Sequence, residues 1–192
     1  MATKHIPTRT HDTTTAPAVS PTSAARPLAV LRAALGLVFL WAFLDKAFGL
    51  GYSTPGERSW LNGGSPTNGF LGHVEVGPLQ SLFRGWAGSP VADGLFMLGL
   101  LAIGLALVLG IGLRIAAVSG ALMMLMMWLA EWPPAQHTST GEATGSSNPL
   151  VDYHVIYAIG VIVVALTAAG DTWGFGRQWK ALPFVRANKW LG

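Results

Sequence analysis

Six ionisable residues at the ends of apolar stretches are the part of this sequence that could do chemistry: Asp45, Lys46, Asp93, Glu131, Asp152 and His154. A charge beside or within a lipid-buried segment is costly, and a transport pathway or a binding site is the usual reason for it. Carboxylates and histidine can move protons, so the candidate catalytic residues are Asp45, Glu131, Asp152 and His154. The ammonium group of Lys46 can attract an anionic substrate, which makes it a candidate binding residue. The competing interpretation is that each residue reaches interfacial water, and for any single one it is the favoured interpretation.

Aromatic residues accompany this set at a similar depth. Tyr153, His154 and Tyr157 share one side of the last apolar stretch. Asp152 is expected to point away from His154, because residues two apart on a helix do not face one another. Two hydroxyls and an imidazole at headgroup depth could hydrogen-bond the carbonyl of a quinone, so Tyr153, Tyr157 and the nearby Trp132 are candidate substrate-binding residues. An ordinary interfacial aromatic belt is the alternative, and it is favoured for the tyrosines.

The spacing of the remaining ligand-type residues does not indicate a metal or a prosthetic group. His73 and Glu75 are two apart, and so are the acid and histidine at 152 and 154. Such pairs diverge on a helix, and no third ligand is obvious. The methionines at 123, 124, 126 and 127 are more typical of adaptable packing than of a metal site. The chain has no cysteine, which excludes thiolate chemistry and sulfur-ligated clusters, and no haem or flavin is indicated.

Four apolar stretches must position these residues. Hydrophobic residues make up 51% of the 192-residue chain and charged residues only 11%, whereas soluble domains carry about 25% charge. No charge occurs from Gly94 to Leu113 or from Ile115 to Ala130. Each run of about 20 residues reaches about 30 Å as a helix, and lipid forces the backbone to be helical. The predicted fold is an all-α integral membrane four-helix bundle with helices at about 27–48, 90–110, 113–131 and 149–169.

The flanking segments differ from the spans in composition. Residues 1–26 are expected to form a disordered cytoplasmic tail, and residues 171–192 a basic, aromatic interfacial tail. The stretch between the first two helices predicts an ordered extracytoplasmic loop with a short amphipathic helix near 79–86. Within the first helix, Arg32 is expected to extend its side chain to the near interface.

The distribution of lysine and arginine predicts the orientation. Three lie in the N-terminal tail, one lies in the turn between the second and third helices, and four lie in the C-terminal tail. Opposite them are only Arg58 and Arg84. The positive-inside rule therefore predicts a multi-pass plasma-membrane protein with both termini in the cytoplasm. The same distribution points to membrane lipid as the partner of the basic residues and not to nucleic acid.

Four segments resemble the DoxX/DoxD family of small four-helix membrane proteins, over about residues 27–192. They are LRAALGLVFLWAFLDKAFG, SWLNGGSPTNGFLG, LLAIGLALVLGIGLRIAAVSGALMMLMMWLAEWPPA and NPLVDYHVIYAIGVIVVAL. The resemblance implies a membrane subunit linked to thiosulfate:quinone oxidoreductase, or a membrane partner of soluble enzymes that handle oxidative and thiol stress. The ionisable positions that match are Asp45, Lys46, Glu131, Asp152 and His154. Because the chain has no cysteine, sulfur chemistry would need a quinone site, a bound anion or a partner subunit.

Three functions are compatible with these observations. The first is a subunit of a quinone-linked oxidoreductase, with quinone as the cofactor and thiosulfate as the implied donor. The second is a non-catalytic anchor or scaffold for a soluble redox or stress-response enzyme. The third is a small-solute carrier, which the lack of an internal repeat or broken helix disfavours. A protein partner or a homo-oligomer is expected in either of the first two cases.

Overall fold

The computed structural model describes residues 21–192, and within them every named element is helical. Four longer helices form its body: α1 (Pro21–Phe48), α4 (Pro90–Leu109), α5 (Leu113–Glu131) and α6 (Tyr153–Leu166). The shorter α-helices are α2 (Pro66–Leu71), α3 (Gln80–Trp86), α7 (Gly176–Ala181) and α8 (Pro183–Ala187). Short 3₁₀ turns are η1 (Gly56–Arg58), η2 (Trp60–Asn62), η3 (Ala169–Asp171) and η4 (Lys189–Leu191).

The first and last predicted helices differ from the observed ones at their N-terminal ends, and the last also ends at Leu166 and not at about 169. The second and third predicted helices agree with the observed ones to within a residue. Residues 21–26 belong to α1 and not to the tail, because alanines upstream of Pro27 favour helix and the proline is accommodated inside it. Residues 1–20 of the predicted tail lie outside the described residues. The last helix starts at Tyr153 instead of at 149, for a reason given with the site below. The short helix expected near 79–86 is present as α3.

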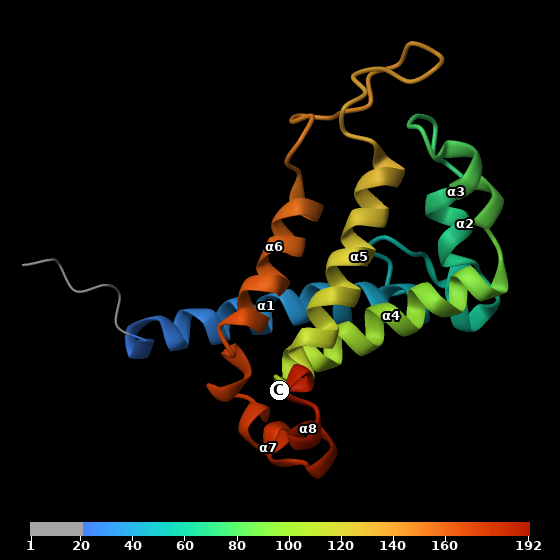
Figure 1. Ribbon diagram of the computed structural model, residues 1–192. Helices are drawn as coiled ribbons and strands as arrows, with labels where there is room; N and C mark the ends of the chain where they lie inside the picture. The colour runs from blue at the N-terminus through green and yellow to red at the C-terminus, as the bar shows by residue number, and fades with distance from the viewer. Residues whose placement is uncertain (1–20) are drawn as a thin grey trace, which may run out of the picture.

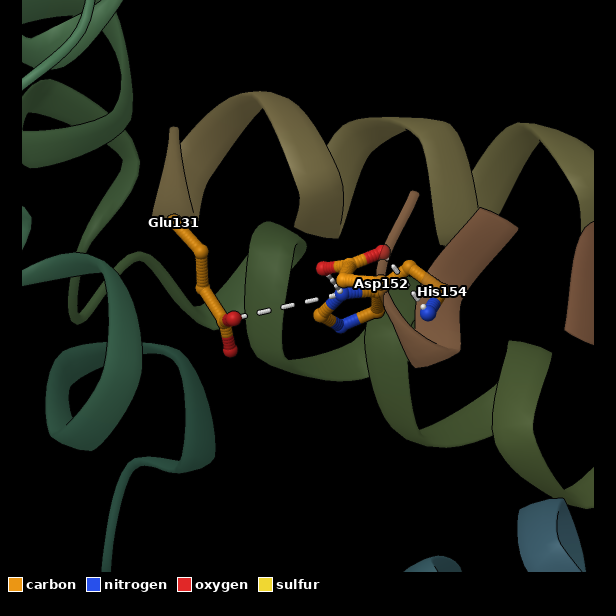
Figure 2. A group of neighbouring side chains, drawn as sticks. All are labelled: Glu131, Asp152 and His154. Carbon is orange, nitrogen blue, oxygen red and sulfur yellow. Dashed lines mark hydrogen bonds and ion pairs between the residues drawn. The ribbon is translucent and has the colours of Figure 1, made fainter. Parts of the chain in front are cut away.

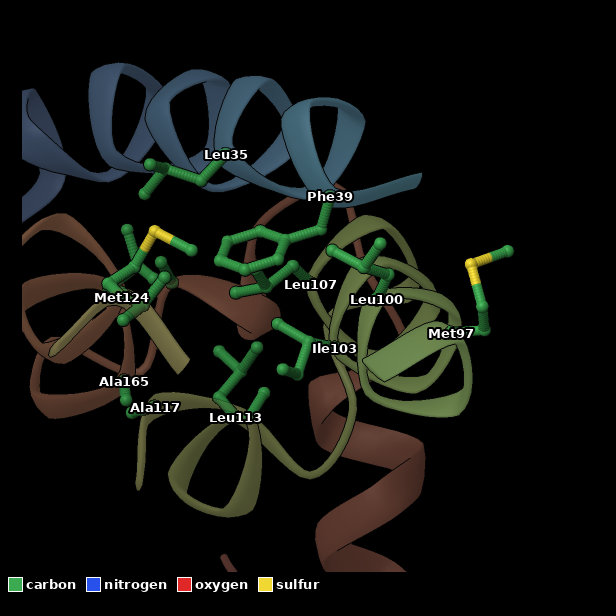
Figure 3. Packing of buried hydrophobic residues seen from close by; sticks show 14 of the residues in the cluster. Leu35, Phe39, Met97, Leu100, Ile103, Leu107, Leu113, Ala117, Met124 and Ala165 are labelled. Carbon is green, nitrogen blue, oxygen red and sulfur yellow. The ribbon is translucent and has the colours of Figure 1, made fainter. Parts of the chain in front are cut away.

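The four longer helices pack as two antiparallel pairs. In Figure 1, α1 and α4 run alongside one another across the view, and α5 and α6 rise steeply from them. The pairs meet where α4 turns into α5, and Gly110 and Gly112 have the left-handed backbone conformation that this turn requires. The side chains between the pairs form one apolar core, in which Leu35 and Phe39 of α1 point towards Ile103 and Leu107 of α4 (Figure 3).

Three helices, α1, α4 and α5, are long and apolar enough to cross a membrane. Their outward faces carry large exposed apolar side chains, including Leu37, Leu95, Leu98 and Leu122. Such faces suit contact with lipid better than contact with water. These features are compatible with a multi-pass membrane protein. With 14 residues, α6 covers about 21 Å, which is less than the hydrocarbon thickness, so the fourth predicted span is not complete as a helix.

Two glycines allow the backbones of α1 and α4 to touch. A Cβ atom on Gly104 would lie 2.8 Å from the backbone nitrogen of Leu40, and one on Gly36 would lie 2.8 Å from that of Val108. Real Cβ atoms do not approach backbone so closely, so only glycine is compatible with this contact. Close backbone approach through small residues is a common way for helices to associate in lipid.

Gly104→Ala is therefore expected to lower the free energy of unfolding by about 1–3 kcal/mol, because the added methyl group forces the helices apart. The matched control is Gly94→Ala in the same helix, where a Cβ atom would meet nothing within 4 Å. That change should be neutral or slightly stabilising, because alanine favours helix. Thermal unfolding of both variants in the same detergent would compare them. Equal stability of the two variants would contradict the observed contact between the helices.

Arg32 is buried at the meeting point of the two pairs, with 1% of its surface exposed. Its guanidinium donates to the carbonyl oxygens of Leu107 and Val108 at the end of α4, and to those of Ala169, Thr172 and Trp173 after α6. The side chain thus reaches the helix ends, where it is buried among backbone carbonyl oxygens. Helix ends leave carbonyl oxygens without donors, and a fully ionised five-donor side chain can satisfy several of them at once.

Candidate functional site

The N-terminus of α6 begins at Asp152, which acts as its N-cap. One carboxylate oxygen of Asp152, Oδ1, accepts hydrogen bonds from the backbone nitrogens of His154 (3.0 Å) and Val155 (3.2 Å). Asn148 directly precedes the predicted helix start at 149, where it would have been the N-cap. It instead accepts from the backbone nitrogens of Leu150 and Val151 in the turn that precedes α6. Asn148 and Asp152 both accept hydrogen bonds from nearby backbone nitrogens. The helix starts after Asp152, which is the closer of the two to the apolar run.

Because Asp152 is a cap and not a helical residue, its side chain bends back over the first turn. Its φ and ψ of −114° and −169° are extended, and its second oxygen, Oδ2, lies 2.8 Å from Nδ1 of His154. The prediction that Asp152 points away from His154 is therefore wrong. An aspartate directly before an apolar helical run is a recognised cap signal, and that signal could have predicted this contact.

Glu131 brings the end of α5 to the same place. One of its oxygens, Oε1, accepts a hydrogen bond of 2.8 Å from the hydroxyl of Tyr153, and the other, Oε2, lies 3.9 Å from Nδ1 of His154. Figure 2 shows the two carboxylates converging on the imidazole ring from different sides. A ligand atom from each of Glu131, Asp152 and His154 lies within 4.8 Å of the other two. We call these three residues the Glu131 cluster.

The Glu131 cluster is buried at one side and open at the other. The side chain of His154 has no exposed surface, that of Asp152 is 16% exposed and that of Glu131 is 36% exposed. Nε2 of His154 is buried without a hydrogen-bond partner among the described residues. A buried imidazole nitrogen that is left unpaired is costly, so this atom needs an explanation.

Of the aromatic residues predicted to bind a substrate, the two tyrosines lie near His154 and Trp132 does not. The ring of Tyr153 lies over that of His154, with centroids 4.0 Å apart, and Tyr157 follows one turn later at 6.0 Å from Tyr153. Trp132 turns away from them. It ends α5 in a left-handed conformation, packs against Trp128 and lies beside Gly77, where a Cβ atom would be only 3.0 Å from its own. The tyrosines thus adjoin the Glu131 cluster, and Trp132 packs against the segment that precedes α3.

Asp45 and Lys46 are engaged in the turn that follows α1. Asp45 accepts from the backbone nitrogen of Tyr52 and from both the backbone nitrogen and the hydroxyl of Ser53. The ammonium of Lys46 donates to the same hydroxyl over 3.3 Å. Within residues 21–192, no hydrogen bond or ion pair joins either residue to the Glu131 cluster. The predicted site residues therefore fall into two separate groups.

Asp93 has the same anchoring role at the start of α4, although the sequence indicated no specific role for it. Its Oδ1 atom accepts from the hydroxyl of Ser65 (3.0 Å) and from the backbone nitrogen (2.8 Å) and hydroxyl (2.7 Å) of Thr67. Asp45 thus holds the start of the segment between α1 and α4, and Asp93 holds its middle. The sequence signal was present, since Ser65-Pro66-Thr67 offers a cluster of donors, but the sequence does not show which acid receives them.

An apolar cavity of about 750 Å³ lies between α2, α3, α4 and α5. Its lining includes Phe70, Phe83, Phe96, Met123, Met126 and Met127. On α5, the cavity is lined by Ser119, Leu122, Met123, Met126 and Met127. The residues of the Glu131 cluster do not line it, so the cavity and the cluster lie on different faces of α5.

Comparison with known proteins adds no assignment to this geometry. No protein-family model matches the chain, and neither the curated proteins nor the solved structures include a match to it.

Proposed function

We propose that the protein is a small integral membrane subunit of a quinone-linked oxidoreductase, with thiosulfate as the electron donor that the DoxX/DoxD resemblance implies. The observation that carries this proposal is the contact between Asp152 and the buried ring of His154. Asp152 fixes one ring nitrogen at 2.8 Å, and the other nitrogen, Nε2, has no partner among the described residues. A carboxylate that orients a histidine in this way leaves the second nitrogen free to act on a bound carbonyl oxygen.

The proposed membrane arrangement has four spans. The three long helices cross the bilayer, and α6 completes the fourth span together with the residues that flank it. Both termini lie on the cytoplasmic side of the plasma membrane, as the distribution of lysine and arginine predicts. The Glu131 cluster then lies near the outer interface. The apolar cavity between α4 and α5 offers room for the isoprenoid tail of a quinone.

The proposed reaction balances as two thiosulfate ions, one quinone and two protons giving one tetrathionate ion and one quinol. Two electrons leave the sulfur atoms as the bond between them forms, and the quinone takes up both electrons and the protons. His154 donates a hydrogen bond or a proton from Nε2 to a quinone oxygen. Glu131, which is partly exposed, connects the cluster with water and supplies replacement protons together with the hydroxyl of Tyr153.

The residues near the end of α1 have a different role in this scheme. The carboxylate of Asp45 accepts three hydrogen bonds from the following turn, so we assign the proton transfer to His154. Lys46 contacts only an exposed serine hydroxyl among the described residues, and its charge can attract an anionic sulfur compound. Because the chain has no cysteine, the sulfur half-reaction proceeds on the bound anion or in a partner subunit.

The lack of cysteine also favours a second function, a non-catalytic membrane anchor for a soluble redox or stress-response enzyme. The exposed aromatic residues of the C-terminal segment, Trp173, Phe175, Phe184 and Trp190, would then hold a basic docking surface at the membrane. The two functions differ in one measurable respect, because an anchor has no need to bind quinone.

The test measures quinone binding and quinone reduction separately. Full-length protein in lipid nanodiscs is titrated with a short-chain ubiquinone analogue, and native membranes that contain the protein are supplied with thiosulfate and the same quinone. His154→Gln keeps a polar side chain of similar length and is expected to reduce the rate of quinone reduction by about 10²-fold or more, because it cannot transfer the proton.

The control for this test is Glu142→Gln, which alters a carboxylate in the loop between α5 and α6 but outside the Glu131 cluster, and it should behave as the wild type. Quinone binding and reduction that are equally strong in the His154 variant would contradict the assignment of the site. A wild-type protein that binds no quinone and gives no activity in native membranes would overturn the proposed function in favour of the anchor.

A further inference from the structure

We propose that the Glu131 cluster is a binding site for one divalent transition-metal ion, with Zn²⁺ as the best match. The cluster offers one imidazole nitrogen and two carboxylate oxygens, all within 4.8 Å of one another. Zinc sites in proteins are built from these same donors. The sequence did not indicate a metal here, because a helical Asp152 would diverge from His154 and no third ligand was obvious. The N-cap position of Asp152 and the packing of α5 against α6 remove both objections.

The spacing of the donor atoms is close to that of a metal site. Ligands at about 2.0–2.2 Å from a tetrahedral ion lie roughly 3.3–3.6 Å from one another. Nδ1 of His154 lies 2.8 Å from Oδ2 of Asp152 and 3.9 Å from Oε2 of Glu131, which are values on either side of that spacing. The two carboxylate oxygens lie within 4.8 Å of each other, and a bound ion would draw them together. Glu131 has a flexible, partly exposed side chain that can make such a movement.

The two carboxylates already have the outer hydrogen-bond partners of metal ligands. Each carboxylate has one oxygen held by a protein donor and the other directed at the imidazole. For Asp152, Oδ1 accepts from the backbone nitrogens of His154 and Val155, and Oδ2 faces the ring. For Glu131, Oε1 accepts from the hydroxyl of Tyr153, and Oε2 faces the ring. Hydrogen bonds of this kind orient metal-binding carboxylates in proteins.

The negative charge of the two carboxylates also favours a bound cation. No lysine or arginine occurs anywhere in the sequence between Arg114 and Arg177. Among residues 21–192, the ion pairs of Glu131 and Asp152 are those with His154 alone. Two carboxylates beside a fully buried ring therefore have no permanent positive charge close to them, and a divalent ion would neutralise both.

Within the described part of the chain, the second ring nitrogen of His154, Nε2, still lacks the outer partner that a metal-bound histidine usually has. A metal ion on Nδ1 requires the ring proton to reside on Nε2, and in metal sites that N–H normally donates to an acceptor. Nε2 is buried and has no acceptor among the described residues. The site thus holds a donor prepared for an oxygen atom of a bound molecule. This last step rests on the proposed function, whereas the metal site itself does not.

The donor set distinguishes between classes of metal ion. Magnesium and calcium prefer oxygen ligands alone, while imidazole together with carboxylates suits zinc, manganese and iron. Three protein ligands leave a coordination position open, and the partial exposure of Glu131 lets water or a small anion reach it. The expected occupant is therefore a transition-metal ion with one exchangeable ligand.

The test uses full-length protein without a histidine tag, purified in detergent, treated with a chelator and dialysed. Zinc is titrated by calorimetry, and cobalt is used as a spectroscopic probe because its visible absorption reports tetrahedral nitrogen and oxygen ligands. We expect one bound ion per chain and, for cobalt, the visible absorption spectrum that is typical of tetrahedral coordination. Glu131→Gln and Asp152→Asn should each weaken binding by more than about tenfold, and Tyr153→Phe should weaken it by a similar or smaller factor through Glu131.

Glu142→Gln is the matched control, because it makes the same change in the neighbouring loop, and it should bind as the wild type does. Size-exclusion profiles and melting temperatures identify any variant that does not fold, and Glu131→Gln, at a partly exposed position, remains informative if the Asp152 variant fails. Absence of stoichiometric binding, or binding that neither carboxylate variant weakens, would overturn the metal site. Quinone binding measured in the metal-free protein separates that outcome from failure of the proposed function.

Discussion

Replacing Arg32 with alanine is expected to lower the free energy of unfolding by about 3–5 kcal/mol, which would leave little folded protein. The guanidinium is 1% exposed and donates to backbone carbonyl oxygens of α4 and of the segment after α6. Removing it leaves those oxygens buried without donors and creates a cavity where the helix pairs meet. Because this one side chain of α1 donates to both segments, its loss should weaken the attachment of both to α1.

Glycines make this arrangement possible, which explains why the loss cannot be repaired locally. A Cβ atom on Gly110 would lie 3.1 Å from one terminal nitrogen of Arg32, and one on Gly174 would lie 3.2 Å from the other. Gly170 approaches the carbonyl oxygen of Gly110 so closely that a Cβ atom there would lie 2.2 Å from it. The backbone surrounds the guanidinium directly, so no side chain is in place to substitute for it.

Thermal and chemical unfolding in detergent, followed by circular dichroism, would measure the effect. Arg114→Ala is the control, because that arginine is exposed and makes two long hydrogen bonds to the backbone of Lys189 and Trp190. Arg114→Ala should lower the free energy of unfolding by less than about 1 kcal/mol. The free energy of unfolding of Arg32→Lys should lie between those of Arg32→Ala and Arg114→Ala, since an ammonium has three donors and lacks the planar geometry of a guanidinium. If Arg32→Ala were as stable as Arg114→Ala, the structural role of Arg32 would be refuted.

The second large effect is a contrast between two aspartates under the same substitution. Asp45→Asn is expected to destabilise the turn after α1 by about 2 kcal/mol, while Asp93→Asn should cost less than about 1 kcal/mol. Both oxygens of Asp45 accept hydrogen bonds, Oδ1 from Tyr52 and Oδ2 from Ser53, so an amide must lose one set. All three bonds to Asp93 end on Oδ1, which an asparagine can retain as its carbonyl oxygen.

Hydrogen–deuterium exchange gives the sharpest measurement, because the backbone amides of Tyr52 and Ser53 are themselves the donors to Asp45. In Asp45→Asn their exchange should accelerate by about 30-fold, which corresponds to about 2 kcal/mol of local opening. The amide of Thr67 should stay protected in Asp93→Asn and lose protection in Asp93→Ala. Similar acceleration in both asparagine variants would show that the negative charge, and not the number of accepting oxygens, holds the segment.

The contrast also bears on the role of Asp45 in function. An acid at the end of an apolar helix has two explanations, a proton-transfer group or a structural anchor. Its hydrogen bonds to the following turn favour the anchor. Asp45→Asn is therefore expected to loosen that turn while quinone binding at His154 persists.

The sequence by itself determined the positions of the helices in the hydrophobic part of the chain. The boundaries at Phe48, Pro90, Leu113 and Glu131 follow from charge-free runs of spanning length and from the glycines and prolines at their ends. Such features are local, because a backbone in lipid must satisfy its own hydrogen bonds and helix is the way to do so within one segment. Even the locally coded start of α6 required a choice between two competing caps, Asn148 and Asp152.

Only the tertiary structure decided which side chains meet. Arg32 finds its acceptors 75 to 141 residues away, and Tyr153 and His154 meet a carboxylate 22 or more residues before them. Periodicity describes which face of a helix is apolar, but the partner of a polar side chain depends on how the helices are placed against one another. That placement comes from packing at glycines such as Gly36 and Gly104, whose effect lies in the neighbouring helix.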